Sequence, residues 1–286
     1  MIVITLIFGV FYLGDLQQAH KSDSSEPSMR SAGAKIPNFS AQKSQQHQPC
    51  SNSREMSDLE KNVPVYVITA TYPRLEQLAE LTRLGQTLKH ARNLMWIVAD
   101  DAPAPTKQVM KLLHRLNVTH KYILGQMPRR FWTWEAQPKG VANRNNALNW
   151  ILSHTDQIRD DSGVVYFADD DNSYDYRLFE EIRKTKKISV FPVGLLSGRP
   201  VSTPIVKKGK VIGYYEGWVG DREFPIDMAG FAFTVQLLKQ AAKLDNVAMP
   251  YSNTDQENGF LKMLNVTMSD FEPLAKRCSE VHRGKF

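Results

Sequence analysis

Gly163–Asn172 reads GVVYFADDDN, a run of β-branched and aromatic residues that ends in three consecutive aspartates. A continuous apolar run of this length is typical of a strand that is covered on both faces of a parallel sheet. Ligands of open α/β sheets bind at the carboxyl ends of the strands, which is where the aspartates would lie. The stretch therefore predicts an α/β fold and the edge of the sheet that carries its site.

The carboxylates of Asp169, Asp170 and Asp171 repel one another, and a packed core would not offset that repulsion. A divalent cation would offset it, and hard oxygen ligands favour Mg²⁺ or Mn²⁺, either of which can neutralise a diphosphate. The alternative is a solvated acidic turn after a strand, which the sequence leaves open. A calcium loop is rejected because its sixth position would be Tyr174, where such a loop requires glycine.

Strand-like and helix-like segments alternate on both sides of this stretch. Apolar and β-branched runs predict strands at residues 64–70, 94–99, 118–124, 163–168, 188–193, 204–206 and 210–215. Apolar residues at helical spacing predict helices at 74–90, 106–116, 140–154, 236–244 and 255–264. The alternation predicts an α/β domain in which helices flank a mostly parallel central sheet, built as two closely packed halves.

The composition excludes several classes of protein. With 42% hydrophobic and 23% charged residues in 286, the chain is neither largely disordered nor fibrous. Its two cysteines, Cys50 and Cys278, are too few for a disulfide-rich scaffold or a four-cysteine zinc site. The net charge of +6 is mild, and the basic and aromatic cluster at 129–134 is small, so no nucleic-acid partner is expected.

Two segments without globular character precede the domain. Residues 1–14 carry no charge, but as a helix they would reach only roughly 21 Å, which favours a truncated signal anchor or a signal peptide at residues 1–16. A Ser- and Gln-rich tract follows and predicts a flexible stem at 17–62. The globular domain would then occupy 63–286.

Three N-x-[ST] sequons, at Asn38, Asn117 and Asn265, fit passage through the secretory lumen and are candidate glycosylation sites. Cys50 lies in the predicted stem, where an oxidisable cysteine can join two chains. A homodimer and an unpaired thiol are therefore both open.

Two further motifs have a functional and a structural interpretation. Trp218, Arg222 and Asp227 offer an aromatic face and charged groups that suit a sugar acceptor, although Trp and Arg also pack together on ordinary surfaces. Thr254 and Glu257 have the spacing of a capping box, and on spacing alone helix capping is favoured.

Taken together, six segments resemble the animal β1,3-glucuronosyltransferases, which are Golgi type II enzymes with a nucleotide-sugar transferase fold of the GT-A kind. They are VYVITATYPR (65–74), WIVADDA (96–102), KGVANRNNAL (139–148), VVYFADDDNSYD (164–175), FPVGLLSG (191–198) and WVGDREFPIDMAGFA (218–232). The resemblance covers residues 64–278, which is nearly all of the globular part.

The resemblance implies a specific reaction. The donor would be UDP-glucuronic acid, the metal Mn²⁺, and the acceptor the 3-hydroxyl of a terminal galactose on a glycan or glycoprotein, with inversion at the anomeric carbon. The enzyme would be held in the Golgi membrane by its N-terminal anchor with the catalytic domain in the lumen, or secreted if the first segment is cleaved. Residues 63–175 would bind the UDP-sugar and 176–286 the acceptor.

The resemblance also assigns roles to residues. The donor-binding positions are Tyr72, Asp101, Lys139, Arg144, Asp169, Asp170 and, if the short C-terminal path reaches the donor, His282. The metal-binding position is Asp171. The acceptor-binding positions are Trp218, Arg222 and Asp227. The catalytic base falls on Glu257, which reverses the interpretation from spacing.

The sequence departs from the family at three places. Lys139 stands where many members have Arg, and Ser202 where the acceptor site usually has Glu. After Cys278 the chain is short, so His282 and Arg283 either replace the family's donor contacts or form a frayed tail. These departures leave a second function open, a catalytically impaired luminal protein that binds glycans or UDP-sugars.

Overall fold

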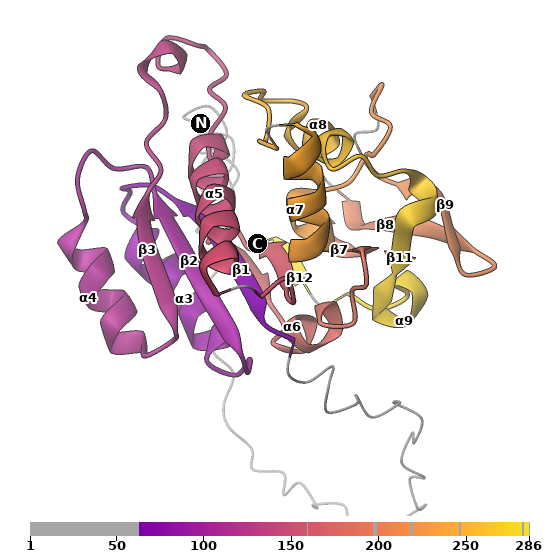
Figure 1. Ribbon diagram of the computed structural model, residues 1–286, viewed down its shortest axis with the longest axis horizontal. Coiled ribbons are helices and arrows are strands. Elements are labelled where there is room, and N and C mark those ends of the chain that lie inside the picture. Colours follow the sequence, from indigo (N-terminus) through magenta and orange to yellow (C-terminus); the bar gives the residue numbers. More distant parts are fainter. Residues whose placement is uncertain are drawn as a thin grey trace, which may run out of the picture. The chain divides into compact units, whose positions relative to one another are not determined.

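The computed structural model describes residues 63–158, 160–196, 199–217, 220–245, 247–281 and 283–285 (Figure 1). The predicted anchor and stem at 1–62, with Asn38 and Cys50, lie outside the described residues, as do Trp218 and His282. Within the described part of the chain, no helix is both long enough and apolar enough to cross a membrane.

A seven-stranded sheet forms the centre of the domain. Its spatial order is β11 (Phe271–Pro273), β6 (Ile188–Val190), β10 (Phe231–Thr234), β4 (Val164–Phe167), β1 (Val65–Thr71), β2 (Leu94–Asp100) and β3 (His120–Leu124). Every neighbouring pair is parallel except the two pairs that involve β10. The predicted α/β fold with a mostly parallel sheet is confirmed, and strands from both predicted halves belong to this one sheet.

Helices cover both faces because the side chains of the central strands alternate between two cores. Even-numbered β1 residues such as Tyr66 and Ile68 pack with α5 (Val141–Ile158), α7 (Val235–Leu244) and α8 (Gln256–Met263). The odd-numbered β1 residues pack on the opposite face, which is covered by α3 (Gln77–Leu88), α4 (Lys107–Leu116) and α6 (Arg177–Ile182). Each strand is thus buried on both sides, as its apolar sequence predicts.

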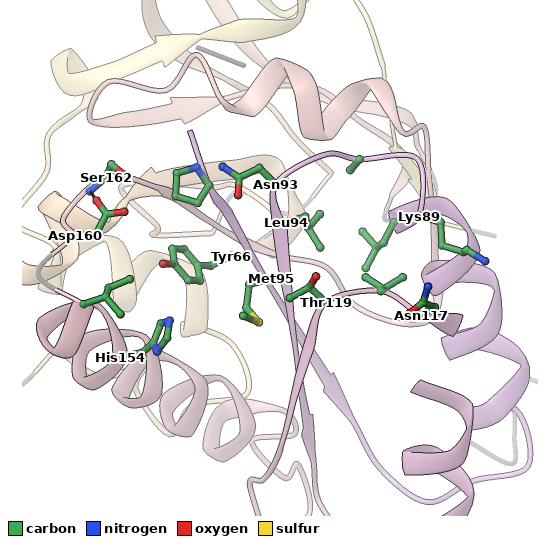
Figure 2. A pocket seen from close by; sticks show the side chains of 15 residues that line it. Tyr66, Lys89, Asn93, Leu94, Met95, Asn117, Thr119, His154, Asp160 and Ser162 are labelled. Atoms are coloured by element: carbon green, nitrogen blue, oxygen red, sulfur yellow. Dashed lines mark hydrogen bonds between the residues drawn. The ribbon is translucent and has the colours of Figure 1, made fainter. Parts of the chain in front are cut away.

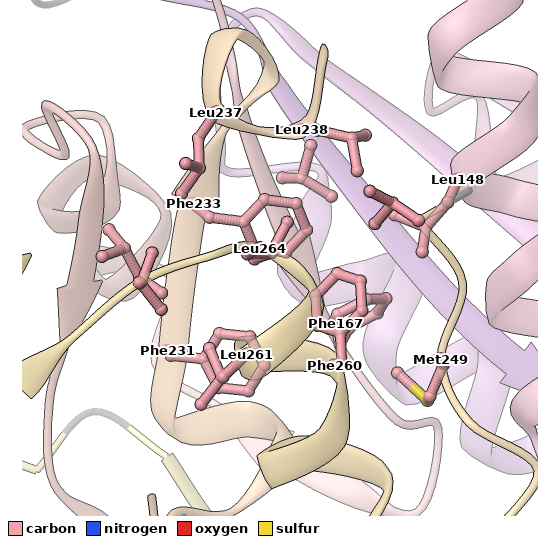
Figure 3. Close-up of a cluster of buried hydrophobic side chains, with 14 of the residues drawn as sticks. Leu148, Phe167, Phe231, Phe233, Leu237, Leu238, Met249, Phe260, Leu261 and Leu264 are labelled. Atoms are coloured by element: carbon pink, nitrogen blue, oxygen red, sulfur yellow. The ribbon is translucent and has the colours of Figure 1, made fainter. Parts of the chain in front are cut away.

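A cluster of phenylalanine rings fixes α8 against the sheet (Figure 3). Phe260 of α8 lies 5.7 Å from the Phe167 ring of β4 and 5.4 Å from the Phe233 ring of β10, measured between ring centroids. All three side chains are fully buried. Because such interiors are close-packed, this contact determines where the first turn of α8 sits relative to the end of β4.

A second, five-stranded sheet has the order β5 (Asn172–Tyr174), β12 (Arg283–Lys285), β7 (Val193–Leu196), β8 (Arg199–Lys207) and β9 (Lys210–Tyr215). Lys208 and Gly209 form the turn between β8 and β9, and both have positive φ, 51° and 78°. Residues 283–285 pair with both β5 and β7. Of the two alternatives for the segment after Cys278, the frayed tail is therefore wrong for the backbone of these residues.

The strand predicted at 188–193 is wrong as a single element. It divides into β6, which belongs to the seven-stranded sheet, and β7, which belongs to the five-stranded sheet. Pro192 lies between them and has no N–H to donate to a ladder. Phe191 donates its N–H to the carbonyl of Gly230 at 3.0 Å, and the chain then changes sheet.

Candidate active site

The carboxyl ends of β1, β2 and β4 meet at one edge of the central sheet. Thr71 and Asp100, the last residues of β1 and β2, are partners in register. Asp101 donates its N–H to the carbonyl of Thr71 at 2.8 Å, which holds the two strand ends together. Tyr72, Asp101 and the acidic triplet after β4 therefore lie at the same edge, as parallel topology requires.

Two of the three aspartates in the triplet bind arginines. Asp169 accepts a hydrogen bond from Arg144 Nη2 at 2.6 Å. Asp170 is buried and accepts one from Arg74 Nη2 and one from Thr71 Oγ1, both at 2.7 Å. The expectation that packed protein groups would not offset the repulsion is wrong for Asp169 and Asp170, because Arg74 and Arg144 provide two positive charges.

Asp171, the third aspartate, is only partly buried and directly precedes β5. The described residues contain no group of three or more His, Cys, Asp or Glu side chains arranged to hold a metal ion. Mg²⁺ and Mn²⁺ sites in nucleotide enzymes commonly use one or two carboxylates, with substrate phosphates and waters as the remaining ligands. Asp171 fits an ion that binds together with a diphosphate, and it does not fit a cage made only of protein ligands.

Arg144 lies in the first turn of α5 and is 8% exposed. Besides Asp169, it contacts the Gln256 side-chain oxygen through Nη1 at 3.4 Å. Burial lowers its pKa, but the charges of Asp169, Glu257 and Asp227 outweigh burial and leave the pKa above its ordinary value. Its Nε is buried and donates to no other described residue, so one donor of this guanidinium is unsatisfied.

Glu257 lies in the first turn of α8, beside the charges just described. The pKa of its carboxyl is raised to about 7. Burial is the largest cause, and the neighbouring Asp227 acts in the same direction, while the Glu257 N–H, Arg144 and Arg222 partly offset the rise. A carboxyl with a pKa near the working pH is suited to accept a proton.

The capping box expected from spacing is absent from α8. The helix begins at Gln256 with Asp255 as its N-cap, so Glu257 is the second helical residue instead of the third. Asp255 accepts a hydrogen bond from the Asn258 side chain at 2.6 Å instead of capping a backbone N–H. Glu257 is therefore not a capping residue, and its carboxyl shares the charged cluster with Arg144 and Asp227.

Asp227 reaches this edge from the second half of the chain. It is the N-cap of the 3₁₀ turn η2 (Met228–Gly230), and its Oδ1 accepts the Ala229 N–H at 3.0 Å. The strand β10 follows η2 and runs antiparallel to β4, so the start of β10 lies beside the end of β4. Topology thus brings Arg222 and Asp227 to the same edge as Asp169.

The aromatic ring of Tyr72 is flanked by two cations. Arg74 lies 4.6 Å from the ring centroid and the Lys139 ammonium lies 5.8 Å from it. Tyr72 itself is 38% exposed, so its ring remains accessible from solvent. Lys139 is exposed and lies just before α5, so its positive charge is near the predicted donor positions. Unlike an arginine, it cannot form two parallel hydrogen bonds to a phosphate.

The model of glycosyltransferase family 43 matches residues 84–283. The chain belongs to glycosyltransferase family 43. It is 44% identical over 220 residues to galactosylgalactosylxylosylprotein 3-beta-glucuronosyltransferase P of Drosophila melanogaster, an alignment that covers 76% of this chain and 44% of that protein. It is 40% identical over 217 residues to galactosylgalactosylxylosylprotein 3-beta-glucuronosyltransferase 2 of Homo sapiens, an alignment that covers 76% of this chain and 67% of that protein.

The chain spans about half the length of the relatives that it matches in Drosophila melanogaster: 44% of the first protein named above, and 54% of galactosylgalactosylxylosylprotein 3-beta-glucuronosyltransferase S. Among solved structures, Staphylococcus aureus TarS 1–349 in complex with UDP aligns at a TM-score of 0.44 with 14% sequence identity, over 77% of this chain and 60% of that one. That similarity is too low to add to the family assignment.

Ser202 stands where the acceptor site of the family usually has a glutamate. In this chain the carboxylate of another residue lies beside it. The Ser202 hydroxyl, on β8, donates to the carboxylate of Glu216, which follows β9, and the Gly217 N–H donates to the other oxygen of Glu216 at 2.8 Å. Ser202 is 6% exposed and Glu216 is 7% exposed. The negative charge that Ser202 cannot supply is thus present two positions before Trp218.

Two residues that organise the family 43 site were not assigned a role from the sequence. Arg74 binds Asp170 and lies against Tyr72, and Asn143 donates its side-chain N–H to the carbonyls of Thr71 and Ala99 at 3.2 and 2.7 Å. Both lie within segments that carry the resemblance, so the motifs contained the signal. The hydrogen-bond partners named here, which are 44 to 96 positions distant in the sequence, could not be predicted from those motifs.

A cavity of about 530 Å³ lies at the opposite end of the central strands (Figure 2). Pro64, Asn93 and Leu94, at the amino ends of β1 and β2, line it. Of the predicted site residues only Asn117 lines it, so this cavity is separate from the acidic edge. Asn117 and Asn265 are both exposed and both follow a helix with a left-handed backbone, φ 54° and 53°.

Proposed function

We propose that the chain transfers glucuronic acid from UDP-glucuronate to the 3-hydroxyl of a terminal galactose, with inversion at the anomeric carbon. Membership of family 43 and the described activity of the relatives support this reaction. The single observation that carries it is the position of Glu257, whose pKa is about 7, beside Arg144 and Asp227. That cluster combines a base with the predicted donor and acceptor positions.

The proposed step is one in-line displacement. The ionised Glu257 carboxylate takes the proton of the acceptor 3-hydroxyl while that oxygen attacks the anomeric carbon. The bond from this carbon to the diphosphate oxygen breaks, and UDP leaves with the bonding electron pair. A positioned base contributes about 10² to 10⁴ in rate, and the reaction needs no second carboxylate as a nucleophile.

On the donor side, Tyr72, Asp101 and Arg144 are proposed to bind the nucleotide, and Lys139 the diphosphate. Asp170 accepts one hydrogen bond on each oxygen, from Arg74 and from Thr71, and is proposed to hold this wall of the site in place. Mn²⁺ bound by Asp171 would supply positive charge that neutralises the diphosphate.

On the acceptor side, Arg222 and Asp227 are proposed to hydrogen-bond the galactose hydroxyls, with Trp218 stacking on the ring. Asp227 faces the same charged cluster as Glu257, so a sugar held there would present a hydroxyl to the base. Glu216 is proposed to take the place of the glutamate that Ser202 lacks.

We also propose a luminal location in the Golgi, with a membrane anchor or a cleaved signal at the N-terminus and a homodimer as one arrangement. The exposed sequons at Asn117 and Asn265 support this location, because glycosylation requires accessible side chains.

The test is UDP release from UDP-glucuronate, measured with and without Mn²⁺ and with and without a galactoside. If the chain catalyses the transfer, UDP release should require both Mn²⁺ and the galactoside. UDP binding without acceptor-dependent release would support the impaired binding protein instead.

A further inference from the structure

Two tryptophans lie exposed on the loop between β3 and α5, residues 125–140. The Trp132 side chain is 50% exposed and the Trp134 side chain is 46% exposed. In Figure 1 this loop rises beyond the strands at the top of the view. Large exposed indoles are uncommon on a monomeric surface, and two of them on one loop mark a contact surface.

Both indoles are held in place. The Trp132 Nε1 donates to the Met127 carbonyl at 3.1 Å. Trp134 packs edge-on against the buried ring of Phe131, with centroids 4.7 Å apart. Phe131 in turn stacks on Tyr251 at 4.5 Å with an interplanar angle of 14°. The exposed faces therefore belong to a rigid platform, which lowers the entropy lost when a ligand binds.

The platform also carries positive charge. Arg129 lies 5.8 Å from the Trp132 ring centroid, and Arg130 lies 4.8 Å from the Phe131 ring centroid. Neither guanidinium forms an ion pair with a carboxylate in the described part of the chain. Glu135 is the one acidic residue of the loop, against three basic residues.

The platform is continuous with the active site on both sides. At the start of the loop, the Met127 N–H donates to Asp101 Oδ1 at 2.9 Å, and near its end Lys139 lies against Tyr72. Tyr251, on which Phe131 stacks, lies in the segment that leads into α8 and Glu257. The first two contacts join the loop to the donor positions, and the Tyr251 contact joins it to the segment that carries Glu257. A glycan bound near Glu257 would therefore reach the platform along the segment that contains Tyr251.

We propose that Trp132 and Trp134 form a second carbohydrate subsite, which binds inner sugars of an acceptor glycan that carries an anionic substituent. The indole faces stack on the apolar faces of sugar rings, and Arg129 binds the sulfate, phosphate or carboxylate group. Arg130 packs on Phe131 and Tyr251 and keeps the platform in position. This subsite rests on the proposed function, since it extends the acceptor site of the same reaction.

The test compares three acceptors with the full chain: a galactose-terminated disaccharide, a galactose-terminated pentasaccharide, and that pentasaccharide with one sulfate on an inner sugar. Trp132→Ala and Trp134→Ala should each raise KM about tenfold for both pentasaccharides and leave kcat and the disaccharide KM unchanged. Trp132→Phe, which keeps a ring, should restore most of the affinity. Arg129→Ala should raise KM for the sulfated acceptor only, and Lys111→Ala, an exposed cation on α4, should change none.

The possible failures are distinguishable. If the unaltered protein does not transfer to the disaccharide, the proposed function fails. If it does transfer, and the tryptophan variants have unchanged KM for the pentasaccharides or equal losses on all three acceptors, the subsite is refuted. An Arg129→Ala loss that is equal with and without sulfate would refute the anionic ligand.

Discussion

Replacing Glu257 by Gln should stabilise the fold at alkaline pH while abolishing transfer. The pKa of Glu257 rises from 4.5 to about 7 on folding, mainly because the carboxyl is buried. The folded chain therefore holds this proton more tightly than the unfolded chain, so ionisation of Glu257 costs stability as the pH rises from about 4.5 to about 7. Above about pH 7 the whole cost is present.

The size of the effect follows from this shift. A difference of about 2.5 pKa units corresponds to about 3 kcal/mol at 1.36 kcal/mol per unit. Glu257→Gln removes the ionisation and keeps a side-chain oxygen for its own backbone N–H. The variant should be more stable than the unaltered protein by about 3 kcal/mol at pH 8.5 and by only about 1 kcal/mol at pH 5.

Urea unfolding followed by tryptophan fluorescence at both pH values measures this difference. Glu223→Gln is the matched control, because Glu223 is exposed and makes only a long contact of 4.0 Å to Lys262. It should leave the free energy of unfolding nearly unchanged at either pH. A Glu257→Gln variant that is less stable at pH 8.5, or equally shifted at both pH values, would show that the carboxyl is not destabilised by burial.

Three further predictions concern the other parts of the site. Asp171→Asn should weaken UDP binding in Mn²⁺ at least about tenfold by calorimetry and leave it unchanged in EDTA; an equal loss in both would remove the metal role. Glu216→Gln should raise the acceptor KM severalfold without changing the donor KM, and a changed donor KM alone would contradict an acceptor role. In a secretory host, peptide N-glycosidase should reduce the mass by two glycans within 63–286, and Asn117→Gln and Asn265→Gln should each remove one; an unmodified domain would contradict the luminal location.

The strands of the central sheet were predictable because they are buried on both faces. β1, β2 and β4 read as short apolar runs, and each ends within about two residues of the predicted position. The division into β6 and β7 was not predictable from periodicity, since both flanks of Pro192 are equally apolar. Only the pairing of Phe191 with Gly230 reveals where the chain changes sheet.

The site was predictable in part. The acidic triplet was found because like charges in sequence need a local explanation, but its arginine partners come from residues 74 and 144, which spacing does not connect to it. For Glu257, spacing favoured helix capping over catalysis. Its raised pKa arises from burial and from the nearby Asp227, and sequence spacing shows neither of them. Glu216 was missed because its contact with Ser202 depends on the register of the β8–β9 hairpin.

The central claim, that Glu257 is the base of an inverting transfer, is tested most directly with purified protein, UDP-glucuronate, Mn²⁺ and a galactose-terminated disaccharide. The unaltered protein should give a β-linked product by proton NMR, with kcat/KM rising tenfold per pH unit below about pH 7. Glu257→Gln should lower turnover at least about 100-fold at pH 7.5 while the Kd for UDP is unchanged. Near-normal turnover by the Gln variant, or an α-linked product from the unaltered protein, would contradict the account.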